Sequence, residues 1–136
     1  MGFMARLETP AYFLLRFIAG SMFALHGAQK ILGFLSEHPQ PAMFSQMWFG
    51  GIIELVGGGL IAVGLLTRFA AFIASGTMAV AYIQFHWELV TTGYKWLPTA
   101  NGGELAVVYC FLFLLVCARG PGPISLDRLF RIDRGV

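Results

Sequence analysis

Residues 11–35 read AYFLLRFIAGSMFALHGAQKILGFL, an apolar stretch with few charged side chains. A helix needs roughly 20 residues to cross the hydrocarbon core, because lipid offers no partner for an unpaired backbone amide. Three further apolar stretches follow, at residues 47–66, 69–87 and 102–118. We therefore predict an all-α fold, in which residues 1–136 form a single domain, an integral membrane four-helix bundle.

The composition of the chain supports lipid as the solvent of this fold. Of the 136 residues, 57% are hydrophobic and 12% are charged, whereas a soluble globular protein carries about 25% charged residues. A net charge of +2 and two cysteines do not match a nucleic-acid-binding protein or a secreted disulfide scaffold. The sequence excludes these classes and a cytosolic enzyme, and it predicts the lipid bilayer as a partner, with no nucleic acid.

The connections between the stretches agree with this division. Pro39 and Pro41 interrupt the first connection, because proline lacks the amide hydrogen that a helix needs. The second connection is only Thr67 and Arg68, which predicts a tight antiparallel hairpin. The third connection covers residues 88–101, and Gly-Pro-Gly-Pro follows the last apolar stretch.

Basic residues predict the orientation of the bundle. With four spans, both termini and the turn at Thr67 and Arg68 share one side of the membrane. Lys30 and Lys95 fall on the other side, and seven arginines fall on the side of the termini: Arg6, Arg16, Arg68, Arg119, Arg128, Arg131 and Arg134. The positive-inside rule therefore places both termini in the cytoplasm.

The end of the chain predicts a separate short helix. Residues 125–134 read SLDRLFRIDR, with Leu126, Leu129 and Phe130 at three- and four-residue spacing. This pattern is typical of a helix that lies in the membrane interface with its apolar face in lipid and its arginines at the headgroups. Binding of a partner protein is the alternative, and we favour the plain anchor.

Polar side chains within the apolar stretches carry the functional prediction. A charge near the bilayer centre costs roughly 2.5 to 3.5 kcal/mol and needs a partner or water. Antiparallel threading brings six polar residues to the outer half of the bundle. Three of them, His26, Gln29 and Lys30, share one helical face. These six candidates are His26, Gln29, Lys30, Glu54, His86 and Glu104.

Glu54 has both a functional and a structural interpretation. It shares a helix face with Gly57 and Gly58, and small residues mark close approach of membrane helices. We therefore expect its carboxylate to point into the protein, with the glycines used for packing. The structural interpretation is an ion pair with Lys30 or His26 that holds two helices in register.

The candidates nearer the helix ends have structural interpretations of their own. Glu104 could be the acid of a capping box that begins at Asn101. His86 lies beside Trp87, an arrangement typical of membrane interfaces. Neither residue needs a ligand to explain its position.

The chemistry of the candidate site suits a small polar headgroup with an apolar tail. The sequence has no motif for dithiol exchange, zinc, haem or a nucleotide, and we predict no metal site. A quinone is the natural candidate, although composition alone does not select it. Its carbonyl oxygens would accept hydrogen bonds from His26, Gln29 or Lys30, and Glu54 would relay protons. We take His26, Lys30 and Glu54 as candidate catalytic residues, and all six as candidate cofactor-binding residues.

Four short motifs occur in order along the chain. They are LLRFIAGSMFALHGAQK at residues 14–30, GGIIELVGGGLIAVGLLTR at residues 50–68, NGGE at residues 101–104 and GPGPISLD at residues 120–127. In this order, they resemble the DoxX family of small bacterial and archaeal membrane proteins. The resemblance implies a four-helix membrane bundle in the cytoplasmic (inner) membrane. The polar positions that it carries over are Arg16, His26, Gly27, Lys30, Glu54, Arg68, Asn101, Glu104, Ser125 and Asp127.

The resemblance also implies a redox setting. The namesakes of the family are subunits of a thiosulfate:quinone oxidoreductase, and relatives are membrane partners of oxidative-stress and thiol-handling enzymes. We therefore hold two hypotheses. In the first, the protein is a redox-associated subunit that binds a quinone or similar small molecule and works with a soluble or membrane redox partner. This hypothesis does not decide whether the protein is itself an enzyme. In the second, it is a non-enzymatic assembly or interaction protein whose buried charges are structural. A homodimer is compatible with both.

Overall fold

The computed structural model describes residues 6–87 and 94–133, and every regular element in these ranges is helical. The all-α prediction is therefore confirmed. Part of the predicted third connection, residues 88–93, and the last predicted basic residue, Arg134, lie outside the described residues. The elements are α2 (Glu8–Leu32), α3 (Gln46–Ile52), the π-helical segment η1 (Ile53–Gly57), α4 (Gly58–Val63), α5 (Thr67–Phe85), α6 (Pro98–Asn101), α7 (Glu104–Arg119) and α8 (Leu126–Leu129).

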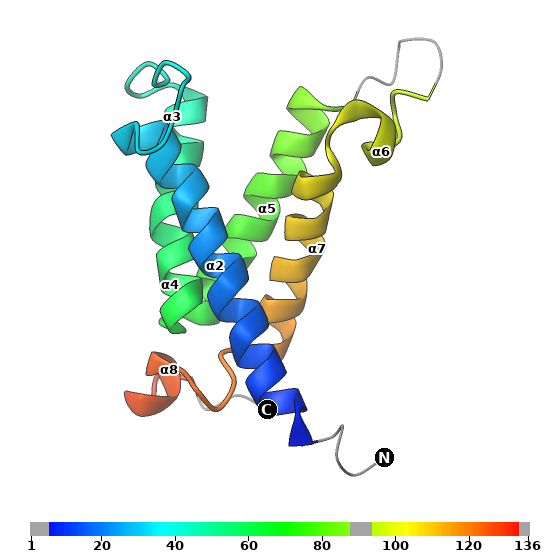
Figure 1. The fold of residues 1–136 in the computed structure, drawn as a ribbon. Helices are drawn as coiled ribbons and strands as arrows, with labels where there is room; N and C mark the ends of the chain where they lie inside the picture. Colours follow the sequence, from blue (N-terminus) through cyan, green and yellow to red (C-terminus); the bar gives the residue numbers. More distant parts are fainter. Residues whose placement is uncertain (1–5, 88–93, 134–136) are drawn as a thin grey trace.

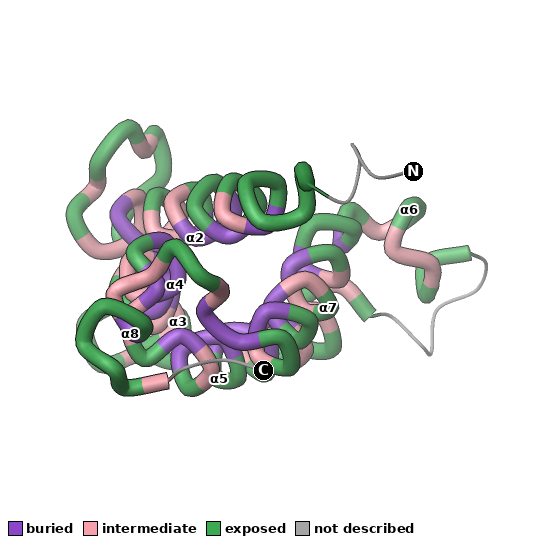
Figure 2. The backbone as a smooth tube through the Cα atoms, turned by 90° about the horizontal axis from the view of Figure 1, so that it is seen from below, coloured by how far each residue is buried: buried purple, intermediate pink, exposed green. Residues whose placement is uncertain are grey.

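The long helices pack as two pairs (Figure 1). The first pair is α2 with the continuous helix α3–η1–α4, and the second pair is α5 with α7. The pairs come together near α8 and diverge toward α3 and α6. We call these two ends of the molecule the α8 end and the α6 end. Seen from the α8 end, buried residues face the centre of the group and exposed residues cover its outside (Figure 2).

Left-handed glycines end two of the long helices. Gly33 has φ of 66° and stops α2 at Leu32, three residues before the predicted end. Gly64, with φ of 74°, stops α4 at Val63 rather than at residue 66. Glycine adopts this conformation without steric cost, so it ends helices efficiently. The hydrophobic pattern placed the C-terminal end of both helices three residues too late, because apolar side chains continue past the glycines; α2 also begins three residues before the predicted start, at Glu8.

Two helices are long and apolar enough to cross a membrane among the described residues, Glu8–Leu32 and Gln46–Val63. The sequence predicted four spans. The third long helix, α5, has 19 residues and the fourth, α7, has 16, which is short against the roughly 20 residues that a span requires. The membrane role of α5 and α7 therefore stays a prediction.

Glycines let α2 and its partner helix touch backbone to backbone. A Cβ added at Gly27 would lie 2.2 Å from the Leu55 nitrogen, and one added at Gly58 would lie 2.4 Å from the Ala24 nitrogen. Such distances leave no room for any side chain, so the first pair is closely interlocked. The predicted packing role is confirmed for Gly58, whereas a Cβ added at Gly57 would meet only the Ile53 side chain, at 4.0 Å.

The C-terminal segment closes the α8 end. Asp127 is 1% exposed, and its two carboxylate oxygens accept hydrogen bonds from the backbone nitrogens of Leu66 and Thr67 at 2.7 and 2.8 Å. They thereby cap the start of α5, whose first amides have no partner within the helix. Within the described residues, the predicted interfacial helix at residues 125–134 is only the single turn α8, and its second residue, Asp127, is buried in this contact instead of facing the membrane interface.

Two arginines complete the closure of the α8 end. The fully buried Arg16 of α2 donates through Nη1 to the carbonyls of Ile61 and Ala62, and through Nη2 to the carbonyl of Ile124 at 2.7 Å. Arg68 of α5 donates to carbonyls at the end of α7. Arg16 therefore joins α2 to the end of α4 and to the segment before α8, and Arg68 joins α5 to the end of α7.

Candidate functional site

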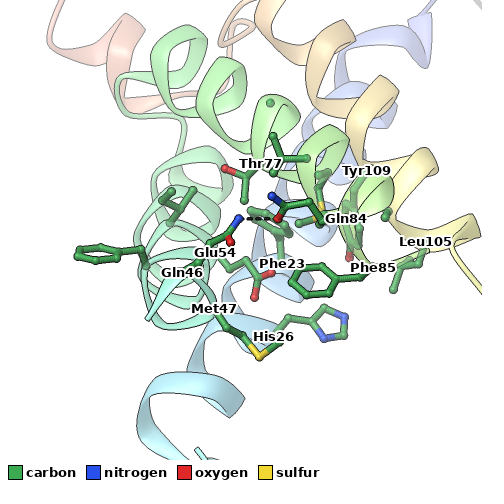
Figure 3. Close-up of a pocket in the computed structure, with 18 of the residues that line it drawn as sticks. Phe23, His26, Gln46, Met47, Glu54, Thr77, Gln84, Phe85, Leu105 and Tyr109 are labelled. Carbon is green, nitrogen blue, oxygen red and sulfur yellow. Dashed lines mark hydrogen bonds between the residues drawn. The ribbon is translucent and has the colours of Figure 1, made fainter. Parts of the chain in front are cut away.

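A cavity of about 730 Å³ lies between the two helix pairs, toward the α6 end. Most of its wall is apolar. Figure 3 shows the lining side chains, which come from α2, α3, η1, α5 and α7. The lining residues that enter the argument are Phe23, His26, Lys30, Gln46, Met47, Glu54, Phe72, Ile73, Thr77, Val80, Gln84, Phe85, His86 and Tyr109.

An ion pair joins the two helices of the first pair at the wall of this cavity. Lys30 of α2 donates through Nζ to Oε1 of Glu54 in η1 at 2.6 Å. Glu54 is 4% exposed, and the Lys30 side chain is 37% exposed. The sequence interpretation of Glu54 as one half of a pair with Lys30 therefore matches the structure.

Only one oxygen of the Glu54 carboxylate is used by the protein. The second oxygen, Oε2, is buried and has no hydrogen-bond partner among the described residues. A buried polar atom without a partner costs roughly 1 to 3 kcal/mol, so native proteins rarely leave one. In Figure 3 the carboxylate points into the space between Phe23, Phe85 and Gln46.

The π-helical segment η1 carries Glu54 at the same level along the helix axes as His26 of α2. Glu54 is the second residue of this segment, which spans Ile53–Gly57. The segment lies against Gly27, the residue after His26, at the close contact with Leu55. Single π turns inside α-helices are frequent at functional sites. Sequence reasoning missed this segment because the run of apolar residues and glycines is compatible with an unbroken α-helix.

Two further polar side chains, His26 and Tyr109, line the same cavity. His26 is half-buried on α2, one turn before Lys30, and lines the cavity together with Tyr109 of α7. The His26 ring makes no hydrogen bond within the described part of the chain, and the same holds for the Tyr109 hydroxyl. The Tyr109 ring packs on Phe23 and Phe113, with centroids 5.4 and 5.3 Å apart, which fixes its place in the wall.

A pair of amides spans the cavity between the two helix pairs. Gln46, the first residue of α3, donates through Nε2 to Oε1 of Gln84, near the end of α5. The hydrogen bond is drawn as a dashed line in Figure 3. The sequence prediction did not include Gln46, Gln84 or Tyr109. A signal existed for Gln84, because Thr77, Val80 and Gln84 recur at three- and four-residue spacing on one face of α5.

The six predicted site residues divide into three groups. His26, Lys30 and Glu54 line the middle of the cavity. His86 lines its edge, where Nδ1 lies 3.2 Å from the carbonyl oxygen of Asn101. Gln29 is half-buried and does not line the cavity.

Glu104 also lies outside the cavity, and the predicted capping box does not form. Glu104 is exposed at the first position of α7, and the residue that caps this helix is Gly103 rather than Asn101. Asn101 ends the extra turn α6, and its Oδ1 accepts a hydrogen bond from the nitrogen of Gly103. The extra turn displaces the start of α7 by two residues from the predicted start at residue 102.

The donor set of the cavity suits hydrogen bonding and proton exchange. Lys30, Glu54, His26 and Tyr109 are all groups that donate, accept or hold a proton. No group of three or more His, Cys, Asp or Glu side chains that could hold a metal ion occurs among residues 6–87 and 94–133. The arrangement therefore offers a polar end for a headgroup and an apolar wall for a tail.

The chain is similar to other proteins over most of its length. The sequence model of the DoxX family matches residues 11–87. A protein of Haemophilus influenzae, described as an uncharacterized protein, is 41% identical over 124 residues, which cover 88% of this chain and 91% of that protein. A second protein of the same organism and description is 32% identical over 78 residues, which cover 57% and 48%. No solved structure matches.

Proposed function

This chain belongs to the DoxX family of membrane proteins, and from that premise we propose that it is a redox-associated membrane subunit that binds a quinone or a similar small molecule. The observation that carries the proposal is the cavity between the helix pairs, which joins an apolar wall to a buried polar group with an unused oxygen. Ligand sites in proteins are typically concave and mostly apolar, with a few placed polar groups. The aromatic and aliphatic wall suits a ring and an attached tail.

In this proposal, His26 and Lys30 donate hydrogen bonds to the oxygens of the headgroup and Glu54 accepts protons. A partner redox protein exchanges two electrons with the bound molecule, and two protons are exchanged with the same oxygens, so that quinone and quinol interconvert. The protein itself supplies the binding site and the proton-exchanging groups. The soluble or membrane partner is not identified by the cavity.

The outer surface of the helices supports four membrane spans in the proposed arrangement. Phe69 and Phe72 of α5 are 67% and 62% exposed, and Phe111 of α7 is 66% exposed. Large exposed apolar surfaces on a protein mark contact with lipid or another protein. We place the α8 end with its arginines in the cytoplasm and the cavity in the outer half of the inner membrane.

The experiment that tests the proposal is extraction of the purified protein. We expect the wild type, purified in mild detergent from its native membrane, to release about one quinone per chain into organic solvent. His26→Ala should release less than half as much, and His38→Ala should match the wild type because His38 lies in an exposed loop. A folded wild type that releases no quinone and does not bind an added short-chain quinone contradicts the proposal.

The second candidate function is a membrane assembly protein, and the Lys30–Glu54 ion pair favours it. A complete ion pair between α2 and η1 can serve helix pairing alone. In that case the unused oxygen of Glu54 has no ligand to serve. Variants of the cavity would then change only the yield or the melting temperature of the protein.

A further inference from the structure

Resting on the proposed function, we infer that the cavity selects the reduced, hydroxyl-bearing quinol over the oxidised quinone. The two forms differ in hydrogen bonding at the headgroup. A quinone presents two carbonyl oxygens, which only accept hydrogen bonds. A quinol presents two hydroxyl groups, each of which both donates and accepts.

The selection begins at the unused oxygen of Glu54. Oε2 is buried and unpartnered, while Oε1 already accepts from Lys30 at 2.6 Å. A carboxylate oxygen only accepts hydrogen bonds, so the ligand must bring a donor to satisfy it. A quinol hydroxyl does so with a charge-assisted bond, the stronger kind. A quinone carbonyl at the same place puts two acceptors against each other at a carboxylate that is itself buried.

The remaining polar groups of the cavity fit a hydroxyl at least as well as a carbonyl. Lys30 keeps two further donors on its ammonium group after the bond to Glu54. His26 and Tyr109 both donate and accept, since a neutral imidazole carries one nitrogen of each kind. A hydroxyl group can therefore receive a bond from Lys30 or His26 while it donates to Glu54. A carbonyl can only receive.

Other cavity residues do not offset this preference. Gln46 and Gln84 bond to each other across the cavity, so their facing amide groups are engaged. The nitrogen Nδ1 of His86 lies against the carbonyl of Asn101 at the edge. Phe72, Ile73 and Val80 form apolar wall that treats the rings and tails of both forms alike. The difference between the two forms is therefore concentrated at Glu54.

The test is a pair of titrations on the full chain in detergent micelles under anaerobic conditions. The probes are a decyl-substituted dimethoxy-methyl hydroquinone and the benzoquinone made from it by oxidation. We expect the hydroquinone to bind about tenfold more tightly, the effect of one net hydrogen bond to a charged group. The dimethyl ether of the hydroquinone, which has lost both donors, should bind no more tightly than the benzoquinone.

Two matched variants locate the preference. In Glu54→Gln the amide both donates and accepts, so the ratio between the two affinities should fall to about one. In Glu104→Gln, where the glutamate is exposed and outside the cavity, the tenfold ratio should persist. If Glu54→Gln does not fold, the comparison of the hydroquinone with its dimethyl ether on the wild type decides the question.

The outcomes separate this inference from the proposed function. Equal affinities for hydroquinone and benzoquinone, or tighter binding of the benzoquinone, overturn the inference and leave quinone binding in place. Tight binding of the dimethyl ether overturns it as well, because donation to Glu54 is then unnecessary. A folded wild type that binds neither probe overturns the proposed function itself.

Discussion

Two buried carboxylates at opposite ends of the molecule are used in different ways. Asp127, at the α8 end, is 1% exposed, and Glu54, toward the α6 end, is 4% exposed. Both oxygens of Asp127 accept from backbone amides. Glu54 uses one oxygen for Lys30 and leaves the other without a partner in the described structure. Burial is therefore similar at the two positions, whereas the unused hydrogen-bonding capacity differs.

Unused hydrogen-bonding capacity, rather than burial, therefore indicates which buried charge is available to a ligand. At the α8 end, Asp127 bonds to amides at the start of α5, and Arg16 and Arg68 bond to carbonyls at the ends of α4 and α7, groups that need partners in any helical protein. Arg16 also donates to the carbonyl of Ile124, and its Nε and the hydroxyl of Thr67 are buried without a partner in the described structure. At the cavity, the helices are already joined by Lys30 and Glu54, and one acceptor remains open. In the proposed function, the ligand satisfies that acceptor, which unlike the buried atoms of the α8 end lies at a cavity.

The largest expected effect is on stability, at the α8 end. Asp127→Ala leaves the buried amide of Thr67 and the partly buried amide of Leu66 without acceptors and should lower the free energy of unfolding by about 3 kcal/mol. Thermal unfolding followed by circular dichroism in detergent measures the effect, with Glu37→Ala in the exposed first loop as control. Quinol affinity should stay unchanged where the variant is folded. Weakened binding with an unchanged melting curve would contradict the division between the two ends.

The next effect separates pairing from binding at Glu54. Lys30→Met leaves a buried carboxylate without its cation and should lower the free energy of unfolding by about 2 kcal/mol. Breaking a fully buried pair costs about 3 to 5 kcal/mol, and the smaller value is expected here because solvent screens the partly exposed Lys30. The double variant Lys30→Met, Glu54→Leu should regain most of this stability and still bind no quinol. Thermal melts and titrations of the same samples provide both measurements. Tight quinol binding by the double variant would show that the ion pair is purely structural.

A smaller effect is expected at His26. His26→Leu should weaken quinol binding about fivefold, the value of one neutral hydrogen bond. The free energy of unfolding should change by no more than about 0.5 kcal/mol, because the ring has no hydrogen-bond partner to lose in the described structure. His38→Leu is the matched control for the titration. A large loss of stability in His26→Leu alone would place His26 among the structural residues.

The smallest effect is expected at the amide pair across the cavity. Gln46→Ala removes one neutral hydrogen bond between α3 and α5 and should cost less than about 1 kcal/mol. Dissociation of bound quinol, followed by stopped-flow fluorescence, should become about twofold faster because the two helix pairs are less firmly held there. Gln29→Ala is the control, since Gln29 does not line the cavity. An unchanged dissociation rate would exclude a role of this bond in ligand exchange.

The sequence predicted the helical class and the meeting of His26, Lys30 and Glu54 because both follow from simple geometry. Apolar stretches locate the helices, and antiparallel threading sets the relative height of their polar residues. The spacing of His26 and Lys30 placed them on one face of α2. Their chemical roles stay predictions, because cavity geometry alone does not show a reaction.

The other features of the fold and the site depend on helix ends, helix faces and long-range contacts, which the hydrophobic periodicity of the sequence does not determine. Glu104 lies outside the cavity because it is on the exposed face of α7, whose other face contributes Leu105, Ala106 and Tyr109 to the cavity. Tyr109 and Gln46 are single polar groups in apolar surroundings, and nothing in the pattern distinguishes them from interface or packing residues. The capping of α5 by Asp127 joins residues 60 positions apart, and only the folded chain shows it.

The close crossing of α2 with the helix α3–η1–α4 limits which substitutions the glycines at the crossing tolerate. Glycines that look alike in the sequence differ in what replaces them: a methyl group at Gly20, Gly27 or Gly58 would meet backbone within 2.6 Å, while one at Gly59 or Gly76 meets open space. In a library of random substitutions, the first three positions should therefore remain invariant among folded clones, and the last two should accept alanine freely.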